Sequence, residues 1–132
     1  MIHIRHLAAV AALVGSLASA TIPVHAKADD YRFELVGKPQ LVNQKDIVQV
    51  RLVRVADGKS VPDAVVFESK ADMGPAGMAT MTAPVRATPA KGGLYSFEVE
   101  PGMAGTWALH LAAKVQGEPD TVRGTVNADL VK

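Results

Sequence analysis

Short segments of alternating apolar and polar residues dominate the chain after residue 30, and turn residues separate them. Successive side chains of a β-strand point to opposite faces, so a period of two predicts strands and not helices. In Val48-Gln49-Val50-Arg51-Leu52, for example, every second residue is apolar. The pattern predicts strands at residues 31–36, 46–55, 64–70, 80–87, 94–100, 106–115 and 121–131.

The phase of these strands predicts a core. Trp107, Leu109 and Leu111 share one face of their segment, and His110 lies on the opposite face. Among the turns, Asp57-Gly58 is the strongest hairpin signal. Antiparallel strands with one apolar face are stable when two sheets cover each other. We therefore expect an all-β fold, an antiparallel immunoglobulin-like β-sandwich of about seven strands with Trp107 in its core.

The first 26 residues have the organisation of a secretory signal peptide. Arg5 precedes an apolar run from Leu7 to Leu17, which is too short to span a membrane. We expect cleavage after Ala26, with Ala20 as the alternative, so that residues 1–26 are the signal peptide and residues 27–132 form one domain. This predicts a periplasmic or otherwise extracytoplasmic protein with no stable membrane span after cleavage. An uncleaved N-terminal anchor is the alternative.

Charge and composition exclude several classes of function. The 14 basic residues include Arg5 of the predicted signal, so the mature domain has as many basic residues as acidic ones, of which there are 13. A neutral domain without a basic stripe is unsuited to nucleic acid, so no nucleic-acid partner is expected. The absence of cysteine excludes disulfides, thiolate metal sites and thiol nucleophiles.

Catalytic motifs are absent as well, and we expect that the protein is not an enzyme. His110 is the only histidine that follows the predicted signal peptide, which removes most nucleophilic and zinc chemistry. Glu98 and Glu100 share one face of a predicted strand, as carboxylates on a solvated surface commonly do.

Methionines supply the clearest candidate site. Met73, Met78 and Met81 fall within nine residues, around Gly74, Pro75 and Gly77. Thioether sulfur is a soft ligand that favours Cu(I), so the cluster predicts a soft-metal site. Glycine and proline would have to fold the segment back so that Met73 approaches Met78. Residues three apart in a regular strand face opposite sides, so a shared site also requires Met78 to lie outside the following strand.

Other interpretations of these methionines remain open. The side chains could fill gaps at the edge of the sandwich or contact a protein partner, because methionine is flexible and apolar. They could also react with oxidants. Met103 and His110 could complete a metal site if their strands and turns lie near the cluster. Otherwise Met103 packs at the core edge and His110 faces solvent.

Two motifs carry a resemblance to a known family. Gly93-Leu94-Tyr95-Ser96-Phe97 is followed by Pro101-Gly102-Met103-Ala104-Gly105-Thr106-Trp107. The chain resembles the YtkA-like domain, which is related to FixH-type domains. The upstream methionine segment and residues 57–65 also look similar to that family. The resemblance implies an extracytoplasmic β-sandwich associated with heavy-metal or copper transport and resistance systems, and it supplies no catalytic residues.

The sequence thus supports two hypotheses about function. In the first, the protein is a periplasmic soft-metal binding or accessory protein of a metal transport or resistance system. Its ion would be Cu(I), held by Met73, Met78 and Met81 with Met103 or His110 as completing ligands. In the second, it is a non-metal interaction module or scaffold of an envelope transport complex, with an envelope transporter or efflux component as partner.

Overall fold

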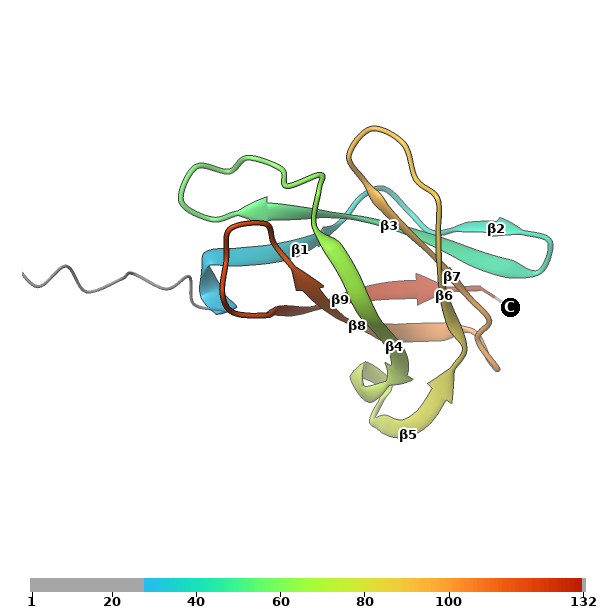
Figure 1. The fold of residues 1–132 in the computed structure, drawn as a ribbon. Coiled ribbons are helices and arrows are strands. Elements are labelled where there is room, and N and C mark those ends of the chain that lie inside the picture. The colour runs from blue at the N-terminus through green and yellow to red at the C-terminus, as the bar shows by residue number, and fades with distance from the viewer. Residues whose placement is uncertain (1–27, 132) are drawn as a thin grey trace, which may run out of the picture.

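Two antiparallel sheets make up the computed structural model, which describes residues 28–131 (Figure 1). The predicted signal peptide lies outside the described residues. One sheet has the order β1-β3-β7-β6, with β2 also paired to β3, and the other has the order β5-β4-β8-β9. We call them sheet A and sheet B. Sheet A contains β1 (Tyr31–Leu35), β2 (Gln40–Val42), β3 (Lys45–Arg54), β6 (Val85–Thr88) and β7 (Tyr95–Val99).

Sheet B contains β4 (Val65–Met73), β5 (Met78–Ala83), β8 (Gly105–Lys114) and β9 (Val122–Leu130). Two single-turn 3-10 helices, η1 (Ala28–Asp30) and η2 (Gly74–Ala76), are the helical elements of the described chain. None of the helical turns within residues 28–131 has the length and apolar character needed to cross a membrane. The prediction of an all-β, immunoglobulin-like sandwich is confirmed.

The core lies where the alternating patterns placed it. Val48, Val50 and Leu52 of β3 are at most 1% exposed, and the residues between them face solvent. In β8, Trp107, Leu109 and Leu111 are buried while His110 is exposed. Their apolar side chains meet between the sheets, where burying each one stabilises the fold by about 1.5–3 kcal/mol.

The predicted strand at 80–87 is two strands in the structure, and they belong to different sheets. β5 pairs with β4 in sheet B, whereas β6 pairs with β7 in sheet A. Pro84 lies between β5 and β6, and because proline has no backbone N–H it cannot donate a hydrogen bond to a neighbouring strand. Its carbonyl oxygen accepts the Glu100 N–H at 3.1 Å, so the crossing is tied to sheet A.

A strand that the sequence pattern did not indicate, β2, forms a hairpin with β3. Its two-residue turn, Asn43-Gln44, has φ values of 49° and 66°. Such a turn matches the twist of the paired strands, but glutamine is an uncommon residue for positive φ. The expected Asp57-Gly58 turn does form, with the Gly58 N–H donated to the Arg54 carbonyl at 2.8 Å. After this turn the chain crosses to sheet B and starts β4.

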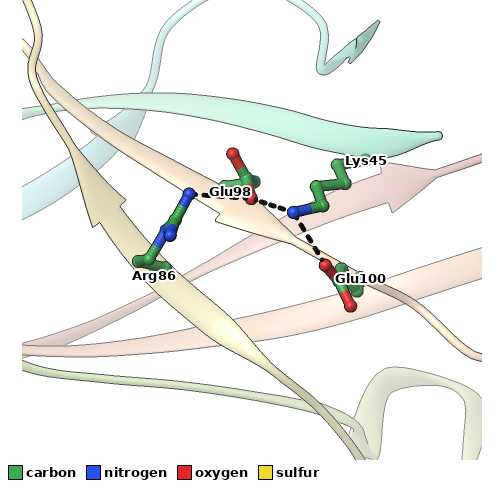
Figure 2. A network of polar contacts seen from close by, with 4 residues as sticks. All are labelled: Lys45, Arg86, Glu98 and Glu100. Carbon is green, nitrogen blue, oxygen red and sulfur yellow. Dashed lines mark hydrogen bonds and ion pairs between the residues drawn. The ribbon is translucent and has the colours of Figure 1, made fainter. Parts of the chain in front are cut away.

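Ion pairs link three neighbouring strands on the outer face of sheet A (Figure 2). Lys45 Nζ lies 2.7 Å from Glu98 Oε1 and 3.0 Å from Glu100 Oε1. Arg86 of β6 approaches Glu98 from the other side, at 3.5 Å. Hydrogen bonding to Lys45 lowers the pKa of Glu98. Glu98 and Glu100 are therefore both paired with Lys45 and are not a free carboxylate pair.

Candidate functional site

The methionine segment folds back on itself between β4 and β5, at the lower edge of the molecule in Figure 1. Pro75 lies in η2, and Gly77 ends that turn in the left-handed conformation with a φ of 78°. The Gly77 N–H is donated to the Gly74 carbonyl at 2.9 Å. Met73 and Met78 consequently become opposite residues of the β4–β5 pair. The predicted return of the chain at glycine and proline is confirmed.

Met78, however, is the first residue of β5, so the condition that Met78 lie outside the following strand is not met. The strand is irregular at this point. The register passes from Asp72 opposite Thr82 directly to Met73 opposite Met78, which leaves residues 79–81 without partners on β4. A bulge of this kind breaks the alternation of faces. The separation of three residues therefore does not decide how Met78 and Met81 are oriented.

Met73 differs from the other methionines in its burial. It is 2% exposed and belongs to the hydrophobic core. Its Cε methyl lies where a side chain on Gly105 would be, only 2.8 Å from the position of a Cβ on that glycine. Glycine at position 105, which has a φ of 149°, therefore leaves room for Met73. Met73 fills a gap in the core, which is the packing role considered for the whole segment.

Met103 is close to the same end of sheet B. It precedes Gly105 by two residues, a span of at most about 7 Å between Cα atoms. Its carbonyl oxygen accepts the Trp107 indole N–H at 3.1 Å, so the core tryptophan fixes this turn. η2 also lies against β8. The structure thus brings Met103 to the methionine turn through the contact between Met73 and Gly105.

Exposure divides the four methionines of residues 28–131 into two kinds. Met78, Met81 and Met103 are 37%, 40% and 40% exposed, respectively, compared with 2% for Met73. A side chain that packs in a core is protected from solvent, and these three are not. Three thioethers at one end of the sandwich are therefore accessible to a ligand, and we refer to Met78, Met81 and Met103 as the exposed methionines.

His110 lies on the outer face of sheet B, as its strand phase predicted, but it is engaged there. Its Nε2 is 2.7 Å from Asp72 Oδ2, and its Nδ1 is 2.9 Å from Thr125 Oγ1. An ionised carboxylate only accepts hydrogen bonds, so Nε2 donates to Asp72, while Nδ1 contacts the Thr125 hydroxyl. The strand order places Asp72 between His110 and β5. Nε2, the ring nitrogen nearer to β5, is therefore engaged by Asp72 and is not free to bind an ion.

Asp72 connects this histidine to the methionine turn. Its Oδ1 accepts the Gly74 N–H at 2.8 Å at the start of η2. The Gly74 N–H, and to a smaller extent His110, lower the pKa of Asp72. A Cβ at position 74 would lie 2.9 Å from Asp72 Oδ1, so glycine permits the contact. Asp72 was not predicted as a site residue, although Asp-Met-Gly is a recognisable turn sequence.

Histidine and carboxylate side chains form no metal-binding cluster within residues 28–131. Within that range, no three histidine, aspartate or glutamate side chains lie close enough together to hold an ion. The residues that can offer a metal site at this end are therefore thioethers, whose chemistry suits a soft ion.

A family model described as YtkA-like matches residues 25–112, which include β1 to most of β8. A solved DUF4426 family protein from Pseudomonas aeruginosa has a TM-score of 0.44 at 15% identity, over 76% of this chain and 88% of that one. The Lin-41 filamin domain has a TM-score of 0.41 at 19% identity, over 70% and 90%. No curated protein matches the sequence. The relation to FixH-type domains stays a prediction. The match over most of its length shows that the chain belongs to the YtkA-like family.

Proposed function

We propose that this YtkA-like domain is an extracytoplasmic protein that binds a soft metal ion, Cu(I), through Met78, Met81 and Met103. The observation that carries the proposal is the contrast in exposure at one end of sheet B, where three thioethers are 37–40% exposed around a fourth that is 2% exposed. Packing explains Met73. The other three thioethers are not used in this packing and remain accessible to a soft ion.

The donor set is smaller than the sequence suggested. Met73 would have to leave the core to reach an ion, which would open a cavity beside Gly105. His110 would have to release Asp72 or Thr125. We therefore assign Met73 the role of a support beneath the site and His110 no direct role. Two or three neutral thioethers supply soft coordination and add no charge to an already neutral domain.

The backbone around the donors is suited to holding them near one another. Met78 starts β5 directly after the turn closed by the Gly77 N–H, and Met81 lies in the bulge of that strand. Trp107 fixes the Met103 carbonyl. A site on anchored turns loses less entropy on binding than one on a free chain. The family membership and the predicted signal peptide support the extracytoplasmic location, and the accessory role in a metal transport or resistance system is part of the proposal.

Metal binding can be tested with the mature protein and Cu(I) under anaerobic conditions, in competition with a chromophoric chelator. The triple variant M78L/M81L/M103L should bind at least about tenfold more weakly, since leucine keeps the size of the side chain but has no sulfur. Met73→Leu is the matched control and should retain the affinity. Thermal unfolding of each variant shows whether the sandwich is intact.

Methyl NMR identifies the donors directly. Ag(I), a redox-stable soft ion, should shift the ε-methyl signals of Met78, Met81 and Met103 and leave that of Met73 in place. Equal Cu(I) affinity in the triple variant and the wild type would sink the proposal. A shift of Met73 alone would contradict the assignment of donors.

A further inference from the structure

Backbone pairing in sheet B stops along one side of β4. This strand pairs with β8 from Val65 to Asp72, but it pairs with β5 only from Ala71 to Met73. Beyond Pro84 the chain that might have continued the pairing belongs to sheet A as β6. On the side away from β8, residues 65–70 therefore have no strand partner in the described chain. We call these residues the open edge.

Apolar side chains mark the same residues. Val65 is 64% exposed and Phe67 is 52% exposed, more than the other large apolar side chains of residues 28–131. Phe67 is also the residue at which the β4–β8 register shifts. Sheet edges are commonly protected by proline or by free charges. The open edge has no proline, and Glu68, its one acidic residue, is already paired with Lys70 at 3.1 Å and with Arg123 at 3.3 Å, so the charge left exposed there is that of Lys70.

The other strands at the margins of the sandwich offer shorter or less accessible edges to an added strand. β2 has three residues and β6 has four, while β5 is interrupted by its bulge. β9 lies beside β1. An added strand gains main-chain hydrogen bonds in proportion to the length of edge it can follow. Of the edges described, residues 65–70 combine length, unpaired backbone and apolar contact.

Charge near the open edge favours an acidic ligand. Lys70 and Arg86, which lies on the neighbouring β6, have side chains 74% and 73% exposed. Their acidic partners, Glu68 and Glu98, are only 33% and 17% exposed. An approaching segment therefore meets the cations first, and opposite charges steer association and select the partner.

We propose that the open edge of β4 binds an extended segment of a protein partner as an added strand, and that this segment combines apolar residues with acidic ones. Backbone groups of residues 65–70 supply the hydrogen bonds, Val65 and Phe67 supply apolar contact, and Lys70 and Arg86 supply charge selection. This surface contains none of the exposed methionines, so it is independent of the proposed metal site.

A short synthetic peptide that alternates valine with threonine and aspartate is the probe. Amide hydrogen exchange of the mature protein should slow at residues 65–70 when the peptide is added. The same peptide N-methylated at alternate amides should not protect these residues, because it lacks the donors of an added strand. A peptide with lysine in place of aspartate should bind at least about tenfold more weakly, because like charges now meet.

Variants locate the contact on the protein. Phe67→Lys should abolish the protection, and Leu41→Lys, which changes an exposed apolar residue of β2, should not. Circular dichroism checks that both variants keep the sandwich. Equal binding of the N-methylated peptide would overturn the proposal. So would a concentration-dependent dimer that protects residues 65–70 without peptide, because the occupant would then be a second copy of this chain.

Discussion

Sheet A and the strand β4 of sheet B differ in how regularly the chain sets their pairing. In sheet A, β3 and β7 pair in unbroken register, and Lys45, Glu98 and Arg86 link three strands across it. Along β4, the register shifts near Phe67 on the β8 side and between Asp72 and Met73 on the β5 side, and three methionines are exposed near the second shift. Regular alternation produced the first region, and glycine, proline and bulges produced the second.

This difference separates residues that hold the fold from residues free to bind. Apolar side chains of the regular region face a closed core, so that changing one leaves a cavity. The apolar side chains of the irregular region, such as Phe67 and Met81, face solvent and contribute little to the core. Both candidate surfaces, the exposed methionines and the open edge, lie in the irregular region.

The largest expected effect comes from the same substitution made in both regions. Phe97→Ala, in β7, should lower the free energy of unfolding by about 3–5 kcal/mol, because Phe97 is 1% exposed in the core. Phe67→Ala should change it by no more than about 0.5 kcal/mol, because that ring is 52% exposed. Urea unfolding followed by Trp107 fluorescence measures both. Similar losses would mean that β4 is packed against more than this structure shows.

The next prediction concerns a polar group inside the regular region. Asp46 is fully buried in β3. Its Oδ1 accepts the Val131 N–H at 3.2 Å, and its Oδ2 has no hydrogen-bond partner. Burial raises the pKa of Asp46, because the charged form loses its hydration, although the Val131 N–H opposes the shift.

A raised pKa in the folded state means that folding favours the protonated acid. The contribution of Asp46 is then complete at low pH, and it declines as the pH rises from the ordinary aspartate range through the raised pKa. Relative to Asp46→Asn, the wild type should lose stability over that window. Urea unfolding from about pH 3 to about pH 8 measures the difference. Asp120→Asn, at an exposed position, is the control, and a pH-independent difference for Asp46→Asn would contradict the prediction.

The smallest effect is expected on the surface of sheet A. Glu98→Gln should lower the melting temperature slightly at neutral pH, because it weakens the contacts with Lys45 and Arg86. The pKa of Glu98 is lowered, chiefly by Lys45, so this stabilisation is present above the ordinary glutamate range and is lost as the pH falls through the lowered pKa.

Salt should reduce the effect of Glu98→Gln, since exposed pairs are screened. Glu100→Gln should have less effect, because the Glu100 side chain is 50% exposed and that of Glu98 is 17% exposed. Scanning calorimetry of the two variants at low and high salt makes the comparison. A larger loss from Glu100→Gln would contradict the ranking of the two carboxylates in the network of Figure 2.

The sequence by itself determined the fold class, most of the strands and much of the core. Alternation is a local property, so the sequence alone predicted which residues of 48–52 and 107–111 face the core and which face solvent. The turn at Asp57-Gly58 and the return of the chain after Met73 were also local, since they depend on which residues tolerate positive φ. The motifs around Tyr95 and Trp107 were sufficient to indicate the family.

Tertiary structure alone decided which methionines are buried and what His110 contacts. The burial of Met73 depends on Gly105, and the engagement of His110 depends on Asp72, 38 positions away in the chain. The change of sheet at Pro84 depends on which edges were available to β5 and β6. Each of these features depends on contacts between segments that are far apart in the sequence. A pattern of period two contains no information about which strands will become neighbours.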